Sequence, residues 1–297
     1  MTITLAALTT QFLDRAELTK STIRSYESVL IPLLKDYGHW SVEIVDRDLL
    51  VEYLNDLEKI KFTTHHKHQA VITALFNFAV ERGHLKSNPI SNLKRRKPDF
   101  EKGECDSDEE IRYLTTQELS LLYRAVKSDA RLNALVHLLH STGARIAEIL
   151  ALNFKDLDTE NRKFQVIGKR NKQRWFFYSQ AAESCLNNYL KYYRHANISA
   201  LFTAQQPFTF DVSRLSYATA HKSLVGAING IEELQGIRFH HLRHTFATER
   251  VGLMGIDELR ALMGHSSIQM TLRYSRVTSK RAEEVAQQAL LKIPSYS

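Results

Sequence analysis

The 297-residue sequence has little cysteine, proline and glycine, with two, five and eleven residues respectively. The two cysteines, Cys105 and Cys185, exclude a disulfide framework and fit a reducing compartment. So few proline and glycine residues disfavour a turn-rich all-β fold. No run approaches the length of a membrane span, and the start lacks the basic segment of a signal peptide. We therefore expect a mainly helical, cytoplasmic protein.

The charge is divided unevenly along the chain. Residues 1–100 carry 14 basic and 12 acidic side chains, residues 101–110 carry one and six, and residues 111–297 carry 25 and 15, which sums to the net charge of +7. A basic C-terminal two-thirds is typical of a protein that binds a polyanion, nucleic acid first. Many soluble domains of this charge bind no nucleic acid, so the charge alone leaves both possibilities open.

The first hundred residues predict a small helical domain. Apolar side chains recur at helical spacing in three stretches: 23–37, 49–57 and 70–79. Pro32 lies inside the first stretch and predicts a kink or a break there. Gly83 is a candidate C-cap of the third helix.

A polar, charged stretch then marks a boundary, so we divide the chain into a helical domain over 1–95, a linker over 96–111 and a second domain over 112–297. In the last, Thr115 and Glu118 have the spacing of a capping box. Residues 163–178 have the β-prone pattern of a hairpin, and the sequence beyond about residue 181 is helical in pattern to its end. The expected fold class is mainly α with a small β-hairpin or sheet, the second domain being mixed α/β.

Four short segments hold the side chains that could do chemistry: TGARIAEIL (142–150), VIGKRNKQR (166–174), FHHLRHTFATE (239–249) and LMGHSSIQMTLRYS (262–275). In the third, His240, Arg243 and His244 fall at i, i+3 and i+4 and share one face of a predicted helix. Taken alone, this is most often a solvated basic face; buried, it would need an anionic partner. Arg243 would repel a cation held between the histidines, so a metal site is disfavoured.

The other segments are weak signals when each is considered alone. Arg145 and Glu148 could be a surface ion pair, Lys169 a solvated loop lysine, and Tyr274 structural filling. His265 follows a glycine that can end a helix.

Together the four segments resemble the tyrosine recombinase (phage integrase) family, of the simple two-domain kind. The family pattern of Arg, hairpin Lys, His-x-x-Arg, His or Trp, and Tyr occurs here in order as Arg145, Lys169, His240, Arg243, His265 and Tyr274. Glu148 matches the acidic residue that the family often carries three positions after the first Arg. GKRNKQR resembles the family's G-K-G-x-K-x-R stretch, with Arg170 in place of the second Gly.

The resemblance implies a DNA strand-exchange enzyme, with residues 1–95 as its DNA-binding domain and residues 112–297 as its catalytic domain. Tyr274 would attack a phosphodiester and keep its energy as a reversible 3′-phosphotyrosine ester. Arg145 and Arg243 would hold the nonbridging oxygens, a task that metal ions perform in many phosphoryl-transfer enzymes, so no metal and no cofactor is expected.

The remaining positions of the pattern imply supporting roles. Lys169 would be the general acid toward the departing 5′-oxygen, and His265 would bond a nonbridging oxygen. His240 would accept the Tyr274 proton, while Glu148 would orient the cluster. His241 is left a structural or DNA-facing role.

Duplex DNA carrying a specific recombination site is the expected partner. Basic side chains of both domains should contact phosphates; the candidates are Arg24, His65, His66, Lys67, Lys172, Arg174 and His244. The HHKH cluster at 65–68 could equally be a solvated helix start. By resemblance, a final helix over 280–292 docks in a neighbouring copy, which predicts a homo-oligomer, a tetramer on paired sites, associated with the nucleoid.

Three other functions remain open. The chain could be a DNA-binding protein on the same scaffold that no longer cleaves, a relaxing enzyme of the type IB topoisomerase class, or a metal-dependent hydrolase. The intact set of six catalytic-type residues and the compact N-terminal helices favour the recombinase.

Overall fold

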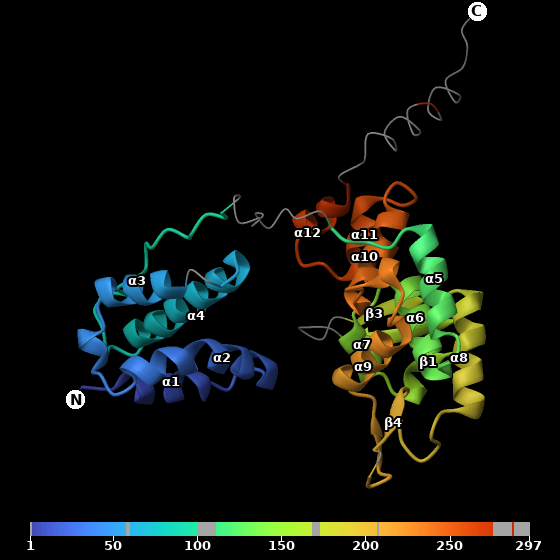
Figure 1. Cartoon of the computed structure of the whole chain (residues 1–297), viewed down its shortest axis with the longest axis horizontal. Coiled ribbons are helices and arrows are strands. Elements are labelled where there is room, and N and C mark those ends of the chain that lie inside the picture. The colour runs from blue at the N-terminus through green and yellow to red at the C-terminus, as the bar shows by residue number, and fades with distance from the viewer. Residues whose placement is uncertain are drawn as a thin grey trace, which may run out of the picture. The chain divides into compact units, whose positions relative to one another are not determined.

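The chain folds into two compact units, residues 1–110 and 111–297 (Figure 1). The structure, a computed structural model, describes residues 2–57, 60–99, 111–167, 173–206, 208–275 and 287. Among them no helix is long and apolar enough to cross a membrane. Each unit has its own hydrophobic core.

The first unit is helical, as predicted. Its elements are α1 (Leu5–Leu13), α2 (Lys20–Tyr37), η1 (Val42–Ile44), α3 (Arg47–Asp56) and α4 (Phe62–Glu81). Side chains of Thr4, Thr19 and Asp46 cap the first backbone N–H groups of α1, α2 and α3. The break expected at Pro32 is wrong, because α2 runs through it. Pro32 and Ser28, whose carbonyl loses its partner, are both exposed, so water can replace the missing hydrogen bond.

The second unit combines helices with two small antiparallel sheets. Its elements are α5 (Thr116–Val126), α6 (Ala130–Thr142), α7 (Ile146–Ala151), η4 (Phe154–Asp156), β1 (Leu157–Asp158), β2 (Lys163–Ile167), β3 (Gln173–Phe177), α8 (Gln180–Tyr192), β4 (Thr203–Gln205), β5 (Val212–Arg214), α9 (Tyr217–Ile228), η6 (Glu232–Leu234), α10 (Phe239–Arg250), α11 (Ile256–Met263), α12 (Ile268–Leu272) and η7 (Arg273–Ser275). The mainly helical fold class with small sheets is therefore confirmed.

The predicted hairpin is β2–β3, in which Gln165 pairs with Trp175, and β1 extends it to three strands. The expectation of helix alone beyond residue 181 is wrong, because β4 and β5 pair there. Strands of three residues are too short to carry a visible alternation of apolar and polar side chains. The predicted capping box of Thr115 and Glu118 is present.

Helix α6 is central to the second core. It packs against α5, α8 and α10, and Leu135, Leu138 and Leu139 are fully buried. Figure 1 shows α10, α11 and α12 gathered at one end of this unit, where α10 meets α6. The core thus fixes α10, which carries the HHLRH segment.

We predict that Leu135→Ala lowers the free energy of unfolding of the second unit by about 2–5 kcal/mol, because Leu135 is fully buried and its truncation leaves a cavity in the core. The sequence has one tryptophan in each unit, Trp40 and Trp175. Urea unfolding followed by Trp175 fluorescence in a Trp40→Phe background reports the second unit alone. Leu253→Ala, at a side chain 77 % exposed, is the control and should change stability by less than about 0.5 kcal/mol. Equal effects of the two substitutions would contradict the packing of α6.

Candidate active site

The site is built where two helices of the second unit end. Helices α6 and α11 both stop at a glycine in the left-handed region, Gly143 at φ 65° and Gly264 at φ 60°. The last carbonyls of a helix lack partners and carry partial negative charge. They accept from guanidinium groups here: Arg243 donates from Nη1 to Gly143 O and from Nη2 to Met263 O, both at 2.6 Å. Arg145 donates from Nη2 to Gly264 O at 3.3 Å.

The Arg243 guanidinium is almost completely buried, at 2 % exposed. Burial, and then the charge of Arg145, lower its pKa to about 10, so it stays protonated at neutral pH. Two neutral carbonyls compensate a buried cation only in part. The surroundings of Arg243 therefore favour the approach of an anion.

Glu148 joins two more guanidinium groups to this region. Its carboxylate accepts from the backbone N–H of Arg145 at 2.8 Å and from Arg145 Nη1 at 3.1 Å, and it also accepts from Arg174 Nη2 on β3. Arg145 and Arg174 thus share one carboxylate. With Arg243, the region holds three guanidinium groups and one carboxylate, which leaves two positive charges in excess. Glu148 has the orienting position expected from the sequence.

Arg174 belongs to this network and not to an open surface. Its side chain is 17 % exposed, and its guanidinium occupies the space where a side chain of residue 264 would begin: a Cβ on Gly264 would lie 1.2 Å from Arg174 Nη1. The expected phosphate contact of Arg174 would require an anion that enters the site itself. The sequence offered no signal for this contact, since the two residues are 90 positions apart.

His265 and Tyr274 lie beside the arginines, on the segment that follows α11. His265 Nδ1 is 2.8 Å from the hydroxyl of the fully buried Thr271, which orients the imidazole and leaves Nε2 as the nitrogen that can meet a ligand. The rings of His265 and Tyr274 are parallel, with an interplanar angle of 6° and centroids 6.1 Å apart.

The hydroxyl of Tyr274 lies 2.7 Å from Nδ1 of His244. The sequence predicts His240 as its partner and His244 as a DNA contact, so the arrangement differs from the expectation. The two histidines are one turn apart on α10, and the ring of His240 meets the ring of His244 edge to face, with centroids 4.3 Å apart. Spacing alone cannot decide which of two residues on one helix face is nearer to Tyr274.

The imidazoles of the site are held neutral. Burial first, and then neighbouring positive charges, lower the pKa of His244 to about 3 and that of His265 to about 4. The pKa of His240 is lowered by the same causes, with Arg243 and Arg145 as the charged neighbours. Burial raises the pKa of Tyr274, and the charges of Arg243, Arg273 and Arg145 oppose that rise. At neutral pH the phenol therefore keeps its proton, and each neighbouring imidazole is neutral and has one ring nitrogen that can accept a hydrogen bond.

Residues 112–281 match the phage integrase family, which is more than half of the chain. The chain belongs to the phage integrase family. This confirms the resemblance to tyrosine recombinases that the four segments carry.

Curated relatives from different bacteria have the same name, tyrosine recombinase XerC. The chain is 28 % identical over 227 residues to the tyrosine recombinase XerC of Haemophilus influenzae, covering 74 % of this chain and 72 % of the relative. It is 27 % identical over 280 residues to XerC of Corynebacterium glutamicum, covering 91 % and 85 %. The second of these alignments includes most of both units.

Solved structures in the family share the fold. The Tn1549 transposon integrase in complex with a circular intermediate DNA aligns with a TM-score of 0.74 at 20 % identity, covering 97 % of this chain and 99 % of that one. The XerH site-specific recombinase bound to its palindromic difH substrate aligns with a TM-score of 0.69 at 22 % identity, covering 89 % and 78 %.

Among the integrase-type positions, Lys169 and also the DNA-binding candidate Lys172 lie outside the described residues. His241 caps the start of α10, where its Nδ1 accepts from the backbone N–H of Arg238 at 3.3 Å. This is the structural role that the sequence left open for it. Within the described ranges, no group of three or more His, Cys, Asp or Glu side chains is arranged to hold a metal ion.

In the first unit, two of the DNA-binding candidates are exposed cations and one candidate is buried. Arg24 on α2 and Lys67 on α4 are exposed, and Lys67 Nζ donates to the hydroxyl of Ser28, one turn from Arg24. His65, in contrast, is 5 % exposed and its Nε2 lies 3.1 Å from Leu54 O, so the expected phosphate contact of His65 is wrong. His66 is half-buried, with Nε2 2.8 Å from Arg96 O.

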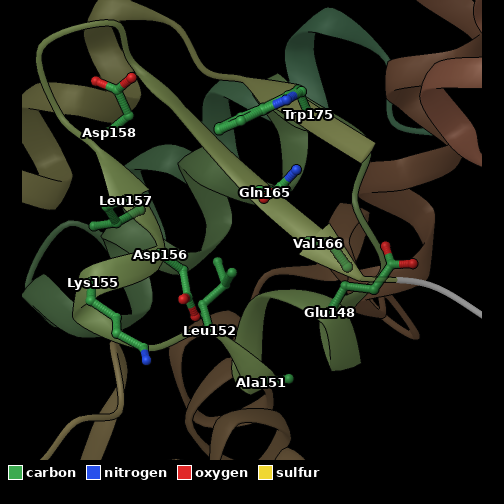
Figure 2. A pocket seen from close by; sticks show the side chains of 10 residues that line it. All are labelled: Glu148, Ala151, Leu152, Lys155, Asp156, Leu157, Asp158, Gln165, Val166 and Trp175. Atoms are coloured by element: carbon green, nitrogen blue, oxygen red, sulfur yellow. The ribbon is translucent and has the colours of Figure 1, made fainter. Parts of the chain in front are cut away.

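A hollow of about 440 Å³ lies beside the site, between α7, η4 and the three-stranded sheet (Figure 2). Glu148 stands at one edge of it, and Asp156 and Asp158 also border it; among the described residues that line it, Lys155 is the one cation. A lining with three carboxylates repels phosphate. The described lining of the hollow therefore differs in charge from the arginine cluster.

We predict that Gly264→Ala destabilises the second unit by about 1–3 kcal/mol more than Gly236→Ala. Both glycines have positive φ, 60° and 72°, so both substitutions strain the backbone, but only a Cβ at 264 collides with Arg174. Urea unfolding of the two variants, read by Trp175 fluorescence, isolates the collision. Equal losses would show that Arg174 moves aside without cost.

The free energy of unfolding should decrease as the pH is lowered, because His244 and His265 are neutral in the folded chain. Their pKa values in the folded chain, about 3 for His244 and about 4 for His265, are below the ordinary 6.5, so the unfolded chain binds protons first as pH falls below about 6.5. Each histidine contributes a slope of up to about 1.4 kcal/mol per pH unit between 6.5 and its folded value. Urea unfolding at pH 7.5, 6, 5 and 4 measures the slope, which His265→Phe should reduce. An unchanged slope would contradict a neutral His265.

Proposed function

We propose that the chain is a site-specific DNA recombinase that cleaves and rejoins duplex DNA through a 3′-phosphotyrosine at Tyr274. Arg145 and Arg243 would hold the scissile phosphate, and neither a metal ion nor a high-energy cofactor would take part. The family membership and the recombinase relatives support the class of enzyme.

The single observation that carries the proposal is the grouping of Tyr274 with a buried, permanently charged Arg243. The phenol belongs to a short 3-10 turn next to α12 and contacts α10 one residue after Arg243. The charges of Arg243 and Arg145 both act on Tyr274 and favour its ionised form. A nucleophile is thus held beside cations that match the pentacovalent phosphate of a transition state.

The phosphate would complete a site that now has excess positive charge. Arg145 and Arg243 each use Nη atoms to fix themselves on helix-end carbonyls, and a guanidinium has five donors in all. The remaining donors would reach the nonbridging oxygens, and His265 Nε2 and the exposed His240 would add further hydrogen bonds. Lys169 would deliver the proton to the departing 5′-oxygen.

Duplex binding would come from both units. Arg24 and Lys67 of the first unit are exposed cations, and the second unit is basic overall. A recombinase joins two DNA sites. The proposal therefore includes the assembly of four copies of the chain, a tetramer, on paired sites. Residues 276–286 and 288–297, which include the expected docking helix, lie outside the described residues.

The test uses a pool of nicked duplexes of randomised sequence, in which cleavage releases a short fragment and traps the covalent complex. We expect a protein–DNA adduct on a denaturing gel that persists in EDTA and disappears in Tyr274→Phe. Sequencing the trapped DNA would identify a substrate for rate measurements. Arg243→Ala should slow adduct formation by on the order of 10²–10³-fold, because a preorganised donor to the phosphate is lost.

Controls separate chemistry from folding and binding. Arg243→Lys keeps a buried positive charge but loses the fork that spans Gly143 O and Met263 O, so it should fold and still cleave slowly. Tyr274→Phe should shift the same DNA in a native gel. An adduct that survives Tyr274→Phe, or cleavage abolished by EDTA, would contradict the proposal. Binding with no adduct would favour the non-cleaving alternative, and relaxation of supercoiled plasmid without exchange the topoisomerase.

A further inference from the structure

His244 is the side chain that touches the proposed nucleophile. Its Nδ1 lies 2.7 Å from Tyr274 Oη, the ring centroids are 5.6 Å apart, and both side chains are half-buried. This distance is that of a strong O–H···N hydrogen bond. His244 is outside the six-residue pattern on which the resemblance rests.

The direction of this hydrogen bond follows from the surrounding groups. The charged or titratable side chains that act on His244 are His240, His241 and Arg243 from α10 and Arg273 from η7, with Tyr274 as its partner. Burial and these groups lower the pKa of His244 and keep the imidazole neutral. The phenol therefore donates to Nδ1, and the imidazole carries its own proton on Nε2.

We infer that His244 is a catalytic residue of strand cleavage, whose Nδ1 accepts the proton of Tyr274 as the phenolic oxygen attacks phosphorus. The inference rests on the proposed function and deepens it. It assigns to His244 the task that the sequence predicts for His240, and it leaves His240 free to bind the phosphate.

The step balances in atoms and charge. The Tyr274 Oη–P bond forms, the P–O5′ bond breaks, the phenolic proton moves to His244 Nδ1, and the general acid protonates the departing 5′-oxygen. In the reverse step a 5′-hydroxyl gives its proton to the deprotonated general acid and attacks phosphorus. The P–O5′ bond forms, the P–Oη bond breaks, and the imidazolium of His244 returns its proton to the leaving phenolate. His244 is thus base in cleavage and acid in rejoining.

The DNA itself would make His244 basic enough. The site has two positive charges in excess without DNA, and one of these cations, Arg243, opposes protonation of His244. A phosphate on Arg145 and Arg243 offsets them, so its arrival raises the proton affinity of Nδ1. Tyr274 would therefore be activated only when a strand occupies the site.

The experiment measures adduct formation on a trapped duplex from the selection described above. At pH 7, His244→Gly should slow cleavage by on the order of 10²–10⁴-fold, the usual contribution of a positioned base. Its rate should rise about tenfold per pH unit, because solvent hydroxide must now remove the proton, while the wild-type rate depends less steeply on pH. Added free imidazole should restore part of the rate to His244→Gly and none to Tyr274→Phe.

His241→Gln is the matched control. This substitution removes a histidine from the same helix. The His241 ring accepts a hydrogen bond from the backbone N–H of Arg238, while Tyr274 pairs with His244, so cleavage should stay within about threefold of wild type. A His244→Gly variant with the wild-type pH profile and no response to imidazole would overturn the inference, while a wild-type adduct at Tyr274 would leave the proposed function standing.

A second readout does not need DNA. In ¹⁵N spectra of the free protein, Tyr274→Phe should shift the Nδ1 resonance of His244 toward that of an unbonded nitrogen. An unchanged resonance would overturn the inferred hydrogen bond. A wild-type chain that gives no adduct would overturn the proposed function and the proton transfer together, and the spectra would still decide whether His244 and Tyr274 are paired.

Discussion

The buried guanidinium of Arg243 is the constraint on which the site depends. A cation at 2 % exposure is costly, and this chain lowers the cost with the carbonyls at the ends of α6 and α11. Those carbonyls point at Arg243 because both helices end in a left-handed glycine. At Gly143 a Cβ would lie 2.3 Å from the ring of Phe246, and at Gly264 it would strike Arg174. Gly143 thus lets the end of α6 approach α10, and Gly264 lets the end of α11 approach β3. Both contacts bring charged side chains into one cluster.

Charge and proton position follow from this arrangement. Burial first, and then neighbouring positive charge, keep the nearby imidazoles neutral. The excess of three guanidinium groups over one carboxylate favours the binding of a phosphate. The neutral His244 can then accept a hydrogen bond from Tyr274, and the incoming strand supplies the negative charge that makes proton transfer favourable. On this account binding and chemistry are coupled, because one anion both occupies the arginines and activates the phenol.

The sequence could predict the parts of the site that depend on local spacing. The i, i+3, i+4 pattern of His240, Arg243 and His244 placed them on one helix face, and the three-residue spacing of Glu148 placed it beside Arg145. The contact between Arg174 and Gly264 and the choice of His244 over His240 depend on how distant elements pack, which no local pattern contains. Local spacing also could not distinguish a buried His65, which bonds Leu54 O across two helices, from an exposed Lys67 two residues later.

The central claim is a covalent bond between Tyr274 and the 3′ end of a broken strand, and its direct test is the chemical identity of the trapped adduct. Nuclease trimming, proteolysis and tandem mass spectrometry would locate the nucleotide remnant on the chain. The account predicts a nucleotide joined through its 3′-phosphate to the phenolic oxygen of Tyr274. A remnant on another side chain, or one joined through a 5′-phosphate, would contradict it.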